Sequence, residues 1–255
     1  MRIRSLILAV CVISAAPMAF ADMASANDAF RAGRYDAALE EASAAGPSAD
    51  AHALKARVTL AKTMCASGEP DPALIREALA SADAALALDP RHGEGRLQKA
   101  IALSLLTRPM SLGEANRSGY GPQAKALAEG VLADDPANHY ALGFLAVWHV
   151  EVHRRGGTLG AAMLGASLKT ARKNYAEAVR LAPEDAGLRW QWARALAAFD
   201  AKKYRSEIES ELEAAIAIDP QTDLDRVMQG RAETLLAELT SKRARNVEDI
   251  ANRMH

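Results

Sequence analysis

Residues 177–183, EAVRLAP, decide the fold, because an alanine-rich amphipathic stretch closed by a proline recurs along the chain. It returns as AALALDP at 84–90, GVLADDP at 130–136 and AAIAIDP at 214–220. A proline ends a helix, since it lacks an amide proton and disfavours helical geometry in the residue before it. A new helical pattern begins two or three residues after each proline. The recurrence therefore predicts a chain built from repeated helical units.

The composition supports helices along the whole chain. Half of the 255 residues are apolar, alanine and leucine dominate, and aromatic residues make up only 5%. Alanine and leucine lose little rotamer entropy in a helix, and small side chains let neighbouring helices approach closely. We therefore predict an all-α protein rather than a sheet protein. The expected helices cover 24–33, 35–45, 49–67, 71–88, 92–107, 122–134, 138–155, 161–181, 185–199, 204–217 and 222–242.

These units resemble the repeats of the tetratricopeptide-repeat (TPR) family, in which a helix pair ends in a proline and small residues stand at fixed places. Gly33, Tyr35 and Ala38 match the family's turn between the two helices. The resemblance implies a TPR-like superhelix of antiparallel helix pairs, in which small residues allow close approach and an aromatic ring fills the turn. The second helix of a repeat is matched by Ala78, Ala82, Ala85 and Pro90, and again by Ala171, Tyr175, Ala178 and Pro183.

The repeats are irregular in length. The prolines that close them are spaced 46, 47 and 37 residues apart, whereas the family's repeat has about 34 residues. The additional residues fall between the two helices of a repeat, at 107–122 and 154–165. Both segments contain several glycines, which are typical of turns or of close backbone approach.

The N-terminus is typical of a secretory signal peptide. Arg2 and Arg4 precede a short apolar stretch, and the small-x-small pattern of residues 19–21, AFA, follows it. We predict a signal peptide over 1–21, cleaved before Asp22, and hence a periplasmic protein. A membrane anchor is the first alternative, although the apolar stretch is shorter than the roughly 20 residues that span a bilayer. A lipoprotein attached through Cys11 is the second, although a bulky valine precedes that cysteine.

The rest of the chain is predicted to form one TPR-like domain over 22–242, followed by a charged tail over 243–255. Without the signal peptide, 29 Lys and Arg residues (31 less two) face 32 Asp and Glu residues, so the net charge is about −3. That balance does not fit a nucleic-acid-binding protein, which needs a basic surface. No later segment has the length and apolar character of a membrane span, so the mature chain is not expected to cross a membrane.

Aromatic residues mark the candidate binding surface. On the expected helix 138–155, three aromatic and two charged residues share one face at intervals of about four residues. The family's register sends the neighbouring face of that helix into packing within the repeat, which leaves this face for the concave groove. Aromatic and arginine side chains are enriched in binding hot spots. An alternative is that they fill contacts between successive repeats. The predicted groove residues are Tyr140, Phe144, Trp148, Glu151, Arg155, Trp190 and Arg194.

Other candidate sites are weaker. His149 and His153 stand four residues apart on one helix, a spacing that suits a metal ion, but no third ligand is evident and core packing explains them better. Cys65 is the one cysteine outside the signal peptide and is predicted to pack as a small apolar residue. No arrangement of nucleophile, base and acid is present, so we predict neither an enzyme nor a bound cofactor or metal.

Two functions follow from these observations. The first is a periplasmic scaffold that holds a peptide or protein partner of unknown identity in its concave groove, with no role for nucleic acid. The second rests on a weaker resemblance to the TPR-type accessory component of periplasmic uptake transporters. In that case the protein binds a small ligand, and segment 156–165 closes a pocket over Trp148 and Trp190. A long open groove favours the first function, and a closed cavity of a few hundred cubic ångströms favours the second.

Overall fold

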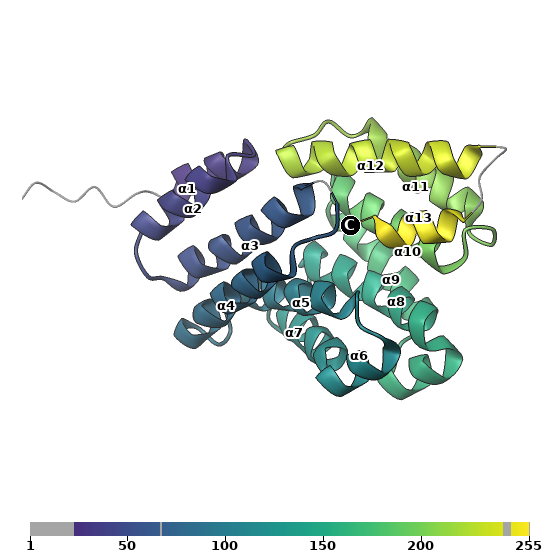
Figure 1. Cartoon of the computed structure of the whole chain (residues 1–255), viewed down its shortest axis with the longest axis horizontal. Helices are drawn as coiled ribbons and strands as arrows, with labels where there is room; N and C mark the ends of the chain where they lie inside the picture. Colours follow the sequence, from purple (N-terminus) through teal and green to yellow (C-terminus); the bar gives the residue numbers. More distant parts are fainter. Residues whose placement is uncertain (1–22, 67, 242–245, 255) are drawn as a thin grey trace, which may run out of the picture.

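A computed structural model describes residues 23–66, 68–241 and 246–254, and within these ranges the chain forms thirteen helices and no strand (Figure 1). The predicted all-α fold class is therefore confirmed. The predicted signal peptide over 1–21 lies outside the described residues. The helices are α1 (Met23–Arg31), α2 (Tyr35–Ala44), α3 (Ala49–Cys65), α4 (Pro72–Leu88), α5 (Gly93–Thr107), α6 (Leu112–Ser118), α7 (Tyr120–Asp134), α8 (His139–Leu164), α9 (Leu168–Leu181), α10 (Ala186–Asp200), α11 (Arg205–Ala217), α12 (Asp223–Thr240) and α13 (Val247–Arg253).

The helices pack in successive pairs. The pairs are α1 with α2, α3 with α4, α5 with α7, α8 with α9 and α10 with α11. Ala78, Ala82 and Ala85 of α4 are completely buried, as the resemblance to the TPR repeat predicted, because only a methyl group fits where two helices cross closely. Between the fourth and fifth pairs, the ring of Tyr175 on α9 stacks on that of Trp192 on α10, with centroids 4.5 Å apart.

Local chemistry sets the ends of these helices. The prolines at 90, 136, 183 and 220 all lie just beyond the ends of α4, α7, α9 and α11, which confirms the positions at which the sequence predicted chain reversals. Polar side chains at the other ends accept hydrogen bonds from otherwise unpaired backbone N–H groups. These N-terminal caps are Ser48, Asp71, Ser111, Asn138, Ser167, Asp185 and Thr222.

The two insertions are more helical than the sequence predicted. Segment 107–122 contains α6, which begins with a capping box between Ser111 and Glu114. Segment 154–165 is also largely helical, but Gly157, with φ 59° and ψ −161°, is non-helical and divides α8 into two helical stretches that meet at a kink. The predicted break in this segment is therefore present, although the second stretch follows Gly157 directly rather than beginning at 161. Only glycine adopts this backbone conformation readily.

The superhelix closes on itself. Helices α3, α5, α8, α10 and α12, called the inner helices below, contact one another in that order, and α12 also contacts α3. At this seam Arg231 donates a hydrogen bond to the main-chain carbonyl of Met64. The Tyr35 hydroxyl lies 3.4 Å from a carboxylate oxygen of Asp223 and donates to it. Chain segments more than 160 residues apart in sequence therefore meet, and the inner helices form a ring.

The C-terminal segment packs against this ring. Val247 and Ala251 of α13 are buried, and α13 lies against α10. The main-chain carbonyl of Met254 accepts a hydrogen bond of 3.3 Å from the Arg108 guanidinium, just beyond the end of α5. Of the helices in the described ranges, none combines the length and apolar character needed to cross a bilayer.

Candidate binding cavity

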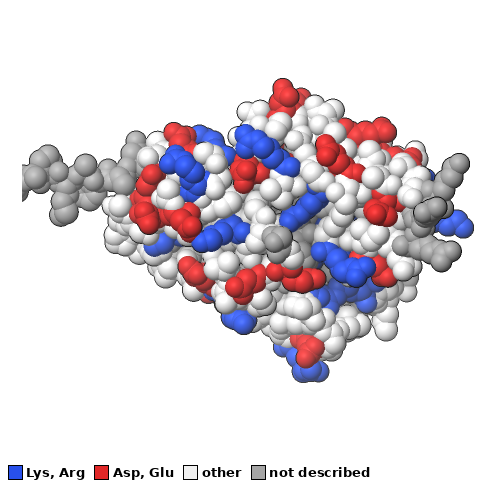
Figure 2. All heavy atoms as spheres, turned by 45° about the horizontal axis from the view of Figure 1, so that its top comes forward, with Lys and Arg blue, Asp and Glu red and all other residues white. Residues whose placement is uncertain are grey.

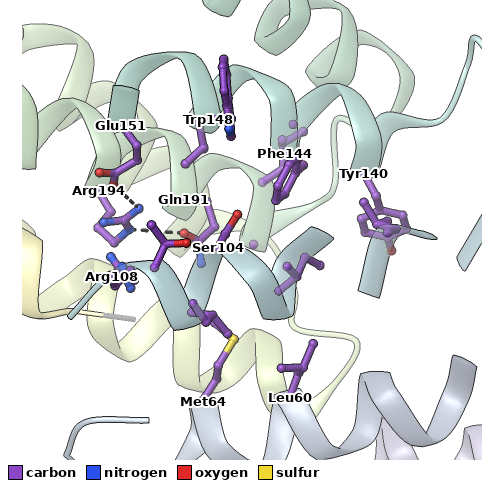
Figure 3. A pocket seen from close by; sticks show the side chains of 18 of the residues that line it. Leu60, Met64, Ser104, Arg108, Tyr140, Phe144, Trp148, Glu151, Gln191 and Arg194 are labelled. Atoms are coloured by element: carbon purple, nitrogen blue, oxygen red, sulfur yellow. Dashed lines mark hydrogen bonds and ion pairs between the residues drawn. The ribbon is translucent and has the colours of Figure 1, made fainter. Parts of the chain in front are cut away.

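The ring of inner helices surrounds a partly open cavity of about 920 Å³. Each inner helix turns one face toward it, and most of the side chains there are aliphatic or aromatic (Figure 3). These faces are apolar because helices rich in alanine and leucine have few polar side chains to place there. Apolar residues of its wall include Leu60 and Met64 of α3, Ile101 and Leu105 of α5, Phe144 and Val147 of α8, Leu188 of α10, and Leu224 and Met228 of α12.

Helix α8 supplies one long wall. Tyr140, Phe144, Trp148, Glu151 and Arg155 all line the cavity, so the spacing that the sequence singled out does place them on one face. Figure 3 shows the first four in order along the helix, from Tyr140 at one end of the cavity to Glu151 at the other. These two lie eleven positions apart, which corresponds to roughly 16 Å along the helix axis.

Trp190 does not join this wall. It is 0% exposed and belongs to the hydrophobic cluster that also contains Ala146 and Val150 of α8. On α10, Gln191 and Arg194 line the cavity, and Trp190 lies about 100° around the helix from Gln191. The placement of Trp190 in the groove was therefore wrong, because the face of α10 that meets the cavity is rotated from the one expected. Six of the seven predicted residues line the cavity, with Arg194 the sixth.

Trp148 combines the two roles that the sequence left open. It lines the cavity but is only 6% exposed, so most of its ring packs between helices. Its indole N–H donates a hydrogen bond of 3.0 Å to the main-chain carbonyl of Gly121, at the start of α7. The Lys125 ammonium lies 5.8 Å from the ring centroid. Trp148 is thus part of the structure that shapes the cavity as well as part of its surface.

One end of the cavity is rich in arginine. Glu151 accepts hydrogen bonds from Arg154 at 2.7 Å and from Arg194 at 3.1 Å. Burial raises the pKa of the Glu151 carboxyl, but the charges of Arg194, Arg154 and Arg108 outweigh burial and bring it down to about 2. Burial and repulsion from Arg194 lower the pKa of Arg108 to about 9, which leaves it protonated at neutral pH.

Arg155 is held differently at the same end. It donates to the main-chain carbonyls of Thr107 and Met110, at 3.0 and 2.6 Å. Those carbonyls lie at and just after the C-terminus of α5, where unpaired acceptors favour a cation. Arg155 therefore joins α8 to α5. Its partners are neutral carbonyl groups, which do not neutralise the positive charge of its guanidinium.

The opposite end, around Tyr140, is acidic. Tyr140 is 53% exposed at this end. Partial burial raises the pKa of its hydroxyl, and Asp185, Glu94 and Asp225 raise it further, whereas Arg57 lowers it. The Glu94 carboxylate pairs with Arg57 at 2.6 Å, and the imidazole of His139 lies 3.7 Å from Asp185. The two ends of the cavity thus carry opposite electrostatic character. On the molecular face drawn in Figure 2, by contrast, acidic and basic side chains are interspersed.

The insertion after the kink forms part of the cavity rim. Gly156, Leu159, Gly160, Met163 and Leu164 all line the cavity, close to the place that the second function predicted for this segment. Leu159 and Met163 are each 74% exposed although both are apolar. These two apolar side chains, four residues apart on an exposed helical turn, form a small exposed apolar patch beside the opening.

Several cavity residues escaped the sequence analysis. Arg108 lies in an insertion that was expected to be a turn, and Gln191 lies on the face of α10 that was misassigned. The α3 residues Leu60 and Met64 belong to another repeat and face α8 only because the superhelix closes. The sequence contains no local signal for that closure. Arg154 is adjacent to Arg155 and three residues after Glu151, and this position on the helix is a local signal in the sequence.

The remaining candidate residues have structural surroundings. The imidazole Nδ1 of His149 accepts from the Ser167 backbone at 3.3 Å, and the ring of His153 lies 6.5 Å from that of Phe199. Cys65 is half-buried at the seam, with its thiol 3.3 Å from the Tyr35 hydroxyl. Among the described residues, no group of three or more His, Cys, Asp or Glu side chains is placed to hold a metal ion.

Comparisons with known proteins define the class of fold. No protein-family profile matches the chain, and no curated protein matches it in sequence. Its structure is similar to that of a thermophilic TPR protein from Thermus thermophilus, with a TM-score of 0.57 and 21% identity over 83% of this chain and 97% of that one. A weaker similarity joins 86% of the chain to 54% of a monomeric IFIT1 mutant solved with Gppp-AAAA, with a TM-score of 0.48 and 15% identity.

The first similarity confirms the TPR-like fold that the repeats predicted. The protein is an α-helical superhelix of TPR-like pairs, an architecture that presents an extended concave surface. Fold alone does not name the bound molecule.

Proposed function

We propose that this protein is a non-catalytic binding protein that takes a small organic molecule into the cavity surrounded by its inner helices. The observation that carries this proposal is the contact of α12 with α3, which turns a concave groove into a ring. The cavity volume of about 920 Å³ falls within the range of roughly 300–1,000 Å³ typical of small-molecule sites. A long peptide groove would instead remain open along the superhelix.

The cavity's chemistry suits binding better than catalysis. Its walls are mainly apolar, with a few charged groups at the two ends, which is the usual composition of a ligand pocket. A general acid needs a pKa near the working pH. The pKa of Glu151 is held at about 2, so its carboxyl is ionised at neutral pH and has no proton to donate.

A second candidate function is a scaffold for a protein partner, which the TPR-like fold and the exposed apolar rim favour. Leu159 and Met163 stand 74% exposed beside the opening, and Leu112 of α6 is 48% exposed and also lines the cavity. Exposed apolar groups of this kind mark protein contacts when they lie together. A partner that docks on this rim would contact these side chains rather than the cavity floor.

The cellular setting is also a proposal. The pattern of residues 1–21 supports export, and with it a periplasmic place. A small-ligand carrier there would suit an accessory role beside an uptake transporter. Export and the periplasmic place are tested by production of the full chain in a Gram-negative host, followed by fractionation and N-terminal sequencing. A chain that stays in the cytoplasm with Met1 intact would contradict export.

The binding proposal is tested by native mass spectrometry of the purified protein, with organic extraction to identify small molecules that copurify. A Ser104→Phe variant fills the cavity, since Ser104 lines it from α5. A Leu159→Ser/Met163→Ser variant changes only the rim. We expect a bound small molecule in the wild type and the rim variant, and its loss in Ser104→Phe. A protein partner lost only with the rim variant, and no small molecule in any sample, would support the scaffold instead.

A further inference from the structure

The charges of the cavity are separated along its length. At the arginine-rich end, Arg108, Arg154, Arg155 and Arg194 all line the cavity, and Glu151 is the one carboxylate among the described lining residues at that end. Glu151 is already shared by two of these guanidiniums. Glu69 adds negative charge near Arg108. Of the four arginines, only Arg194 is buried, so its unmet hydrogen-bonding capacity is the most costly.

Arg194 leaves one donor without an acceptor. The side chain is almost completely buried, with 3% of the residue exposed. Its Nη2 donates to Glu151 and its Nε donates to Gln191, whereas Nη1 has no hydrogen-bond partner. A buried donor without a partner costs free energy comparable to a lost hydrogen bond. Nη1 is itself covered, so an oxygen anion in the cavity would satisfy it once the guanidinium turns toward the cavity, and a carboxylate matches the planar guanidinium especially well.

An apolar channel leads away from this end. Figure 3 shows Phe144 on α8 facing the α5 and α3 side of the cavity, with Leu60 and Met64 on the facing wall. The wall between Glu151 and Tyr140 extends over roughly 16 Å. A hydrocarbon or aromatic body of that length or less would be buried along it, and such burial stabilises binding in proportion to the apolar area removed from water.

The far end disfavours a second acid group. Glu94, Asp185 and Asp225 contribute negative charge near Tyr140, and Arg57 and His139 offset part of it. A molecule with carboxylates at both ends would place one of them among these acidic groups. Repulsion of like charges is the usual device by which a site rejects an unwanted ligand.

We propose that the cavity selects a small amphipathic monocarboxylate, whose carboxylate lies beside Arg194 and Arg108 and whose apolar body lies along Phe144 toward Tyr140. This inference rests on the proposed small-molecule function and adds the chemical class of the ligand. The carboxylate replaces the missing acceptor of Arg194, and the acidic far end makes the orientation unique.

The test uses titration calorimetry of the full-length protein with decanoate, decanol, decanedioate and decyltrimethylammonium at neutral pH. We expect decanoate to bind at least tenfold more tightly than the other three. Arg194→Gln should weaken decanoate at least tenfold and leave decanol unchanged. Glu151→Gln should strengthen decanoate several-fold, because it removes the carboxylate that competes for the same guanidiniums.

The outcomes separate this inference from the function on which it rests. If decanol and decanoate bind equally well to the wild type, the ligand class is wrong but the small-molecule cavity stands. If none of the four binds and no small molecule copurifies, both proposals fail. A further titration tests whether the cavity binds the C-terminus of a peptide instead of a small molecule. It compares an apolar octapeptide that has a free C-terminal carboxylate with the same peptide as its amide. Tighter binding of the acid peptide than of decanoate would assign the cavity to a peptide terminus and overturn the small-molecule class.

Discussion

The substitution Glu151→Gln gives a quantitative test of the electrostatics inside the cavity. Glu151 is mostly buried, with its side chain 21% exposed, and it pairs with Arg154 and Arg194. These charges bring its pKa from the ordinary 4.5 to about 2. A tenfold change in an acidity constant corresponds to about 1.4 kcal/mol, so the ionised carboxylate stabilises the fold by about 3 kcal/mol at neutral pH. Glutamine keeps the shape of the side chain and removes this contribution.

The sign of the pH dependence follows from the lowered pKa. The stabilisation is complete above the ordinary pKa of 4.5 and is lost as the pH falls toward 2, because the carboxyl is then protonated in the folded state as well. Urea unfolding of the wild type and Glu151→Gln at pH 7, 4 and 3 measures this. We expect a difference in unfolding free energy of about 3 kcal/mol at pH 7 that falls to less than half of that value at pH 3.

Glu177→Gln is a matched control. Glu177 also pairs with an arginine three residues along its helix, at 2.6 Å, but this pair is exposed to solvent. Exposed ion pairs contribute little to stability, so the control should unfold like the wild type at every pH. Equal stabilities of the wild type and Glu151→Gln at pH 7, or a difference that does not narrow in acid, would refute the reasoning.

Three further substitutions test the kink, the seam and the wall. Gly157→Ala should lower the unfolding free energy by about 1–3 kcal/mol in thermal denaturation, because its φ of 59° is strained for alanine. Gly160→Ala is the control, since Gly160 has open space around it and no positive φ, and its unfolding free energy should stay unchanged. Gly33→Ala should speed amide hydrogen exchange at the start of α12, since its methyl group would lie 2.7 Å from a side chain there. Gly46→Ala shares the positive φ but faces open space, so exchange in α12 should stay unchanged. Trp148→Ala should cost about 3–5 kcal/mol in urea unfolding, as for other buried tryptophans, and an unchanged midpoint would place its ring on the surface.

The prediction for Trp148→Ala differs from the one that the sequence alone suggests. A groove residue on an open surface would affect binding and leave stability intact. In the structure the indole of Trp148 is buried and bonded to the Gly121 carbonyl, so shape and binding depend on the same side chain. Ligand affinity should therefore be measured in Trp148→Phe, which keeps an aromatic ring in the wall.

Much of the fold could be predicted from the sequence because its signals are local. The prolines at 90, 136, 183 and 220 end helices wherever they occur, and alanines at 78, 82 and 85 leave space only for a close neighbour. The insertions were harder, since both contain helical turns between their glycines, and Gly157 divides α8 at a kink without introducing a long loop. Glycine by itself indicates freedom of the backbone and does not say which conformation the surroundings select.

The candidate site was predictable along one helix and less so across several. The stripe from Tyr140 to Arg155 follows from helical periodicity, and five of its residues do line the cavity. The position of Trp190 depended on how α10 is rotated against its neighbours, which small differences in packing decide. Whether any of these residues binds a ligand stays a prediction.

The sequence by itself determined the helix pairs, most of their boundaries and the aromatic face of α8, because capping, proline placement and periodicity act between residues a few positions apart. Only the tertiary structure decided that the concave surface closes into a cavity. The hydrogen bonds from Tyr35 to Asp223 and from Arg231 to Met64 join residues 188 and 167 positions apart. Contacts at that distance depend on the summed rotation of every intervening helix pair, and that sum brings the arginine-rich end, the apolar wall and Tyr140 around a single space.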